Sequence, residues 1–274
     1  MKQKKDSLKN KKAVRPVAHG IAIKKQFGQH FLRDQRVVDH MIERVALTKQ
    51  TSVFEIGCGD GFLTKSILQQ PIARLVVFEI DPEWAQFVQG QYPSPRMTIL
   101  QENILDVKPE FFHEHAPWVL LANLPYSITF PILHILQKNR LSLQEGVVMI
   151  QEEVAQKLVK KSGRGYGYVS LFFQYYFDLE LMERIKPGAF VPPPKVDSRL
   201  LYFKPKKEVV EIPDEAGFWK FIKACFSQPR RTLRNSLSAY HFDLDLIPAQ
   251  YHELRSQQLS MEDFLAIWEI VRNK

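Results

Sequence analysis

The sequence predicts an α/β fold, with a doubly wound, mainly parallel sheet over residues 26–204 and a small all-α domain over residues 205–274. Short apolar runs alternate with helical patterns and are centred near Val53, Val77, Ile99, Leu120 and Val148. A later antiparallel pair is expected to end at residues 200–203. After a linker at residues 204–207 only helical patterns remain, and we expect those helices to overhang the ends of the strands.

The first 25 residues form a basic segment. Nine of them are lysine or arginine and one, Asp6, is acidic, so the excess of eight equals the net charge of the whole chain, +8. We expect residues 1–25 to be a flexible extension that contacts a phosphate backbone. A purely solubilising extension is the alternative.

A glycine loop follows the first buried strand. The apolar run at residues 51–56 leads into Gly57, Gly59 and Gly61 and then into a helical pattern from Phe62. Strand, glycine loop and helix in that order are typical of nucleotide-binding folds. The spacing is one residue shorter than the pattern that holds a pyrophosphate, so we interpret it as the site of a cofactor with a nucleoside but no phosphates.

An acidic residue ends the next predicted strand. Glu79 lies about twenty residues after the glycine loop, where a carboxylate accepts hydrogen bonds from ribose hydroxyls. Asp81 and Pro82 are expected to cap and open the following helix. The alternative for Glu79 is a solvated carboxylate at the end of a strand.

The run at residues 118–126 predicts a pocket for a flat base with an exocyclic amine. Asn123 offers a side-chain carbonyl, Leu124 a backbone carbonyl and Tyr126 a ring for stacking, while Pro125 holds the turn rigid. An ordinary turn after a strand is the alternative. Because parallel strands end at one edge of a sheet, the glycine loop, the ribose carboxylate and this motif are expected to line one crevice.

Basic side chains cluster in two later segments. The first precedes a glycine-aromatic loop at residues 163–168, which we expect to lie along RNA. In the second, a helix beginning at Pro229 would place Arg230 and Arg234 on one face. Solvated charged surfaces are the alternative. The side chains expected to bind RNA are Lys160, Lys161, Arg230, Arg231 and Arg234.

Composition limits the remaining classes of protein. No run approaches the roughly twenty apolar residues of a membrane span, and no apolar signal sequence opens the chain. We therefore expect a cytoplasmic protein that does not associate with a membrane. Cys58 and Cys225 lie far apart and the eight histidines are scattered. The sequence therefore predicts no metal site.

The chain resembles the S-adenosyl-L-methionine-dependent adenine-N6 dimethyltransferases of ribosomal RNA, the KsgA/RsmA family. This resemblance implies a Rossmann-like class I methyltransferase sheet and covers the chain from about Gln26 onward. It rests on residues 26–32, on the glycine loop at residues 55–61, on Glu79, on Asn123-Leu124-Pro125-Tyr126, and on the proline-rich segment at residues 190–198.

The resemblance also implies roles for single residues. The implied cofactor contacts are Gln29, His30, Leu32, Gly57, Gly59, Glu79, Ile80, Asn103 and Asn123. The implied catalytic residues are Asn123, Leu124, Pro125, Tyr126 and Phe190, with the rings of Tyr126 and Phe190 on either side of the target base. Asn103 stands where the family usually has an aspartate beside the cofactor adenine, and Asp106 is the alternative ligand.

The activity that follows from the resemblance is double methylation of N6 on two adjacent adenosines near the 3′ end of small-subunit (16S) ribosomal RNA. The partner would be an immature 30S-type subunit, and the enzyme a monomer. The cofactor sulfonium is already a strong electrophile, so positioning and desolvation suffice without a general base.

Three other functions stay open from the sequence. A related class of enzyme methylates adenine of large-subunit ribosomal RNA and confers antibiotic resistance. A ribosome-assembly factor would keep the same fold and bind RNA without catalysis. A nicotinamide dehydrogenase is disfavoured, because the glycine spacing lacks the extra residue of a pyrophosphate site.

Overall fold

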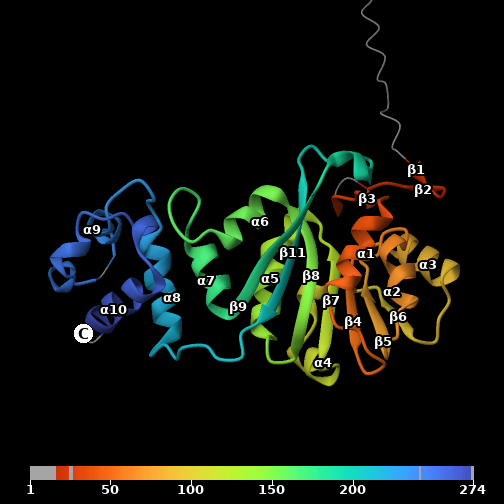
Figure 1. Cartoon of the computed structure of the whole chain (residues 1–274), viewed down its shortest axis with the longest axis horizontal. Coiled ribbons are helices and arrows are strands. Elements are labelled where there is room, and N and C mark those ends of the chain that lie inside the picture. Colours follow the sequence, from red (N-terminus) through yellow and green to blue (C-terminus); the bar gives the residue numbers. More distant parts are fainter. Residues whose placement is uncertain (1–16, 25–26, 241, 273–274) are drawn as a thin grey trace, which may run out of the picture.

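A computed structural model describes residues 17–24, 27–240 and 242–272, and a seven-stranded sheet runs through its centre (Figure 1). The strand order is β6-β5-β4-β7-β8-β11-β9. The strands are β4 (Ser52–Ile56), β5 (Arg74–Phe78), β6 (Met97–Leu100), β7 (Trp118–Asn123), β8 (Leu143–Gln151), β9 (Phe177–Ile185) and β11 (Ser198–Pro205). The first five strands in this order, β6, β5, β4, β7 and β8, run parallel to one another. Strand β11 is antiparallel to both of its neighbours, β8 and β9. The predicted mainly parallel sheet and its late antiparallel pair are confirmed.

Helices cover both faces of the sheet. On one face, Val53 and Val119 belong to an apolar cluster with α1 (Gln35–Glu43), α2 (Phe62–Leu68) and α3 (Pro82–Gln91). On the other face, their neighbours Phe54 and Leu120 cluster with α4 (Pro109–Glu114), α5 (Thr129–Lys138), α6 (Glu152–Val159) and α7 (Tyr168–Tyr176). Successive strand residues point to opposite faces, which explains why these strands appear in the sequence as unbroken apolar runs.

Helix ends follow the local sequence signals. The Asp81 side chain accepts a hydrogen bond from the backbone N–H of Glu83, and Pro82 is the first residue of α3. Ser260 and Asp263 form a reciprocal capping box at the start of α10 (Met261–Val271). Both predicted helix starts are confirmed.

The described part of the N-terminal segment folds against the body of the protein. The strands β1 (Val17–Ala18) and β2 (Ile21–Ala22) form a hairpin, and β3 (Phe31–Leu32) pairs with β10 (Phe190–Val191). Ile23 packs with Phe31 and Trp84, and Lys24 Nζ lies 2.7 Å from Asp81 Oδ1. Residues 17–24 therefore depart from the expected flexible extension, whereas residues 1–16 and 25 lie outside the described part of the chain.

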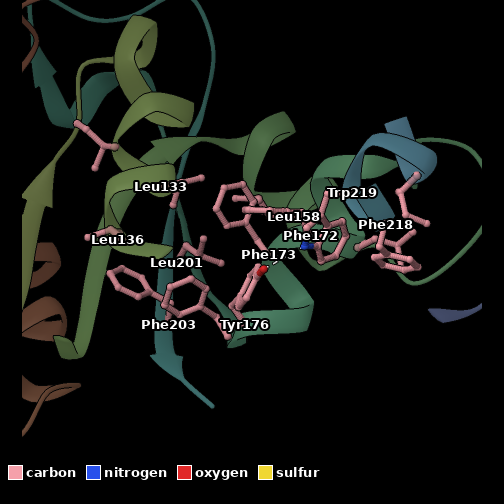
Figure 2. Packing of buried hydrophobic residues seen from close by; sticks show 14 of the residues in the cluster. Leu133, Leu136, Leu158, Phe172, Phe173, Tyr176, Leu201, Phe203, Phe218 and Trp219 are labelled. Carbon is pink, nitrogen blue, oxygen red and sulfur yellow. Dashed lines mark hydrogen bonds between the residues drawn. The ribbon is translucent and has the colours of Figure 1, made fainter. Parts of the chain in front are cut away.

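The C-terminal helices share their core with the sheet. The helices α8 (Glu215–Cys225), α9 (Leu233–Leu237) and α10 lie beyond α7 at one end of the molecule (Figure 1). Trp219 of α8 packs on Phe172 of α7 with ring centroids 4.9 Å apart, and its Nε1 donates to the Tyr176 hydroxyl at 3.0 Å (Figure 2). One apolar cluster runs from β11 through α7 into α10. The domain boundary after residue 204 stays a prediction.

The arginine segment differs from its predicted helix. Residues 228–231 form a turn, and α9 begins only after Thr232, whose side chain caps the helix. A threonine hydroxyl satisfies a free backbone N–H at the helix start, which Pro229 does not do. The predicted start at Pro229 is therefore wrong, and Arg230 and Arg234 do not share a helix face.

Replacing Gly146 of β8 with alanine is expected to lower the free energy of unfolding by about 1–3 kcal/mol. A Cβ at this position would lie 2.5 Å from the Phe203 ring and 2.7 Å from the Leu120 carbonyl oxygen, so the sheet would have to shift. Urea unfolding of both variants measures the effect, with Gly90→Ala as the control. At Gly90, within α3, an added Cβ meets no heavy atom within 4 Å. Equal unfolding midpoints for the two variants would contradict the expectation.

Candidate active site

A cleft lies at the carboxyl ends of the parallel strands. Its empty space, including the part open to solvent, is about 1250 Å³. The lining comes from residues 27–32, 55–60, 78–80, 102–105 and 123–126, with Met41, Phe62, Leu63 and Ile128. All of these residues precede α5, so in the described part of the chain α8 to α10 do not reach the cleft. The expectation that the C-terminal helices overhang it is therefore wrong.

The glycine loop turns between β4 and α2 along one side of the cleft. Gly57, Gly59 and Gly61 all have positive φ, at 73°, 53° and 81°. Residues with a side chain rarely adopt this backbone conformation. A Cβ on Gly59 would lie 2.8 Å from the Phe31 ring. The sequence therefore needs glycine here both for the backbone conformation and for the close approach of β3.

Glu79 is buried at the end of β5 with 6% of its surface exposed. Its carboxylate accepts hydrogen bonds from the backbone N–H of Asp81 at 2.9 Å and of Gly59 at 3.3 Å. Burial raises the pKa of Glu79, while these two N–H groups oppose that shift. A solvated carboxylate is excluded, and the side chain is fixed against the glycine loop.

Asn123 ends β7 with its amide against the N-terminal side of the cleft. Its Nδ2 donates to the backbone carbonyl of His30 at 3.0 Å. Because this bond occupies the nitrogen end of the amide, Oδ1 turns away from His30. The amide thus presents an acceptor at a residue that lines the cleft.

The residues after Asn123 extend the strand and then turn. The backbone N–H of Leu124 donates to Met149 at 3.1 Å, and Pro125 precedes a 3-10 turn over Tyr126–Ile128. The Tyr126 ring lies 6.3 Å from the His30 ring at an angle of 27°. Burial raises the pKa of the Tyr126 hydroxyl, which keeps the group protonated. Leu124, Pro125 and Tyr126 all line the cleft, as expected.

Phe190 lies outside the cleft. It is 3% exposed and packs in the apolar cluster of α1 and α2. In β10 it pairs with Leu32, which turns its ring inward, whereas the next residue, Val191, is 50% exposed. The Phe190 ring is therefore not placed to face a base opposite Tyr126, as was expected, because strand pairing directs it into the core.

The segment after β6 contributes Asn103 to the cleft. Asn103 lines it and accepts a hydrogen bond from the Leu105 N–H at 3.1 Å, whereas Asp106 is exposed and is not among the lining residues. Of the two alternatives, the structure places Asn103 at the site. Ile80 also lines the cleft and has 47% of its surface exposed.

Residues 27–32 form the wall beside the glycine loop, where the Phe31 ring lies against Gly59. Gln29, His30 and Leu32 all line the cleft. The Gln29 side chain, however, bonds within the protein, accepting from the Lys24 N–H at 2.8 Å and donating to Asp81 at 3.2 Å. Gln29 therefore holds this wall in place. Gln26 lies outside the described residues.

The predicted RNA-binding residues lie away from the cleft on the surface. Lys160 and Lys161 are exposed after α6, and Arg230 and Arg231 are exposed in the turn before α9. Arg234 is exposed on α9, where it pairs with Asp245 at 3.1 Å.

The glycine-aromatic loop is only partly available to a partner. Tyr166 is 5% exposed and packs on Phe226, with ring centroids 5.8 Å apart. The expectation that the aromatic side chains of residues 163–168 lie along RNA is thus wrong for Tyr166, because that ring is part of the core. Lys160, Lys161 and Arg164 stay exposed beside it.

Three acidic residues that line the cleft, Glu55, Asp60 and Glu102, were not predicted as site residues from the sequence. Glu55 is 1% exposed and accepts from the Thr64 hydroxyl at 2.7 Å, and burial raises its pKa to about 8. Asp60 pairs with Arg33 at 2.5 Å. A carboxylate inside the apolar run of β4 was the available signal for Glu55, whereas the Asp60 pair depends on tertiary structure.

Among the described residues, no group of three or more histidine, cysteine, aspartate or glutamate side chains is arranged to hold a metal ion. No helix in the same residues has the length and apolarity to cross a membrane.

Solved structures share this fold. A dimethyladenosine transferase from Plasmodium falciparum is 22% identical and superposes with a TM-score of 0.76 over 88% of this chain and 96% of its own. The 23S rRNA methyltransferase ErmE is 20% identical, with a TM-score of 0.71 over 89% of this chain and all of its own. The fold, with a glycine loop opening into a cleft, is that of a class I methyltransferase.

Sequence comparison narrows the class to a family. The family model described as ribosomal RNA adenine dimethylase matches residues 20–271. A relative from Chlorobium phaeobacteroides strain BS1 is 35% identical over 92% of this chain and 95% of its own, and one from Bacillus cereus strain AH187 is 33% identical over 91% of both. Both are named ribosomal RNA small subunit methyltransferase A. The chain belongs to the ribosomal RNA adenine dimethylase family.

The buried carboxyl of Glu55 predicts a pH-dependent stability. In the unfolded chain it loses its proton near pH 4.5, but in the fold only near pH 8, so its contribution to stability falls as pH rises through that window. Glu55→Gln is expected to reduce the fall in melting temperature between pH 5 and pH 9 (roughly the limits of that window). The control is Glu153→Gln, at an exposed position on α6. Parallel melting curves for wild type and Glu55→Gln would contradict this role.

Proposed function

We propose that this protein transfers methyl groups from S-adenosyl-L-methionine to N6 of two adjacent adenosines near the 3′ end of small-subunit ribosomal RNA. One observation carries the proposal: the glycine loop, the buried Glu79 and the Asn123–Tyr126 motif line the same cleft. Membership of the dimethylase family and the names of the curated relatives support the RNA substrate.

The cleft fits this cofactor. A Cβ built on Gly57 meets no heavy atom within 4 Å, so the loop backbone faces open space that a ligand can enter. The fixed carboxylate of Glu79 suits ribose hydroxyls, and Ile80 and Asn103 offer an apolar surface and a polar edge for the adenine. When bound, the cofactor supplies a methyl group on a positively charged sulfur.

The amine of the target base would meet the end of β7. Asn123 Oδ1 and the Leu124 carbonyl accept its two hydrogens, which favours a pyramidal nitrogen with its lone pair directed at the methyl group. Tyr126 stacks on the ring, so the base has to leave its own stack to enter. No general base is required, because the nitrogen loses its proton only after the new bond forms.

The phosphate backbone of the RNA would be bound outside the cleft. We assign phosphate contacts to Lys160, Lys161, Arg230, Arg231 and Arg234, all exposed and outside the cleft. Their placement suits a large substrate such as an immature 30S-type subunit. We propose that the protein acts on it as a monomer in the cytoplasm.

Labelled S-adenosyl-L-methionine and undermethylated small subunits test the activity directly. The expected product in the nucleoside digest is dimethyladenosine. Large subunits lacking their own adenine methylation serve as the parallel substrate and are expected to remain unlabelled. Label on guanine, on cytosine, on protein or on the large subunit alone would refute the assignment.

Asn123→Ala is expected to lower kcat by at least about 100-fold, because it removes a preorganised acceptor at the reacting nitrogen. Binding of small subunits should change little, since the assigned phosphate contacts lie elsewhere. Asn123→Asp distinguishes the roles of the two ends of the amide, because it keeps an oxygen acceptor and removes the donor to His30. Full activity of Asn123→Ala would show that the amine is held by other groups.

Lys24→Met is expected to weaken binding of S-adenosylhomocysteine by about tenfold. Lys24 pairs with the fully buried Asp81, whose N–H in turn holds Glu79. Calorimetric titration measures the loss. Arg36→Met is the control, because it removes an exposed ion pair on α1, away from this network. Equal affinities for the two variants would show that Lys24 does not contribute to cofactor binding.

A further inference from the structure

A hydrogen bond links the cleft to a strand that does not line it. The hydroxyls of Tyr126 and Ser198 lie 2.7 Å apart, although the residues are 72 positions apart in the chain. Ser198 is fully buried at the start of β11 and is absent from the cleft lining. It therefore touches the site only through Tyr126.

The Ser198 side of this bond is held rigidly. Ser198 pairs with Gln151 of β8 and with Ile185 of β9, so strands flank it on both sides. The preceding carbonyl, of Asp197, accepts from the Glu152 N–H at 3.0 Å. The following residue, Arg199, forms two hydrogen bonds with the Glu152 carboxylate, at 2.6 and 2.9 Å. The serine hydroxyl thus has a fixed position.

The Tyr126 side has less support of its own. The tyrosine begins a 3-10 turn of three residues, and no side chain caps that turn. Its ring is half-buried, and Phe190, which was expected to face it, is packed in the core. The outer end of the tyrosine side chain is therefore anchored where its hydroxyl meets Ser198, which limits rotation about the Cα–Cβ bond.

We propose that Ser198 is a positioning residue for the target base: its hydroxyl anchors the outer end of the Tyr126 ring, and the anchored ring places the stacked purine with its amine against Asn123 and Leu124. This inference rests on the proposed function. Stacking is sensitive to the position of the ring, and methyl transfer needs the nitrogen in line with the methyl group, so a ring whose outer end can move costs rate. Ser198 acts through Tyr126 and makes no contact with the base itself.

Removal of the bond from either side is the test. Ser198→Ala and Tyr126→Phe are compared singly and together, with kcat and KM for undermethylated small subunits at saturating cofactor. Each single variant is expected to lower kcat by roughly tenfold with little change in KM, because basic surfaces outside the cleft bind the subunit. The double variant should be no slower than the slower single variant, since both changes remove one interaction.

Controls separate positioning from a loss of folding. Ser256→Ala removes another buried serine hydroxyl, which donates to the Cys225 carbonyl at 2.6 Å far from the cleft, and is expected to keep wild-type kcat. Affinity for S-adenosylhomocysteine is expected to stay unchanged in all variants. Should Ser198→Ala fail to fold, Tyr126→Phe removes the same bond while leaving the serine in place.

Two results overturn the inference. One is wild-type kcat in a folded Ser198→Ala or Tyr126→Phe variant, and the other is a double variant whose loss equals the product of the two single losses. Failure of the proposed function gives a different result, because the wild-type protein would then form no dimethyladenosine on small subunits at all.

Discussion

One hydrogen bond, from Asn123 Nδ2 to the carbonyl of His30, sets the geometry on which the cleft depends. It joins the end of β7 to the segment that enters β3, 93 residues earlier in the chain. An amide has one donor end and one acceptor end, so committing the nitrogen decides where the oxygen points. The same contact ties residues 27–32 to the end of β7. One interaction therefore fixes both a wall of the cleft and the direction of its central acceptor.

A buried charge connects that wall to the carboxylate of Glu79. Asp81 is fully buried and receives hydrogen bonds from Lys24 and Gln29, while its own N–H donates to Glu79. A buried carboxylate is tolerated only when such partners replace the water that it has lost. The segment before β3 is thus a structural requirement of the site, although its sequence resembles a simple basic tail.

Features carried by local sequence were predictable, and those set by distant contacts were not. The strands, the glycine loop and the caps at Asp81 and Ser260 depend on periodicity or on neighbouring residues, and the structure has them as expected. The burial of Phe190 depends on its pairing with Leu32, far away in the chain. Near α9 two local signals competed, and the side-chain cap of Thr232 determined the helix start over Pro229.

The aromatic contacts between α7 and α8 make the C-terminal helices continuous with the interior of the sheet (Figure 2). A part attached by a flexible linker alone would swing freely, but Trp219, wedged against Phe172 and Tyr176, ties α8 to the body. The basic side chains after α6 and before α9 are therefore carried by elements of one packed core. Any change in their spacing to follow a bound RNA would have to break the contacts of Trp219 with α7.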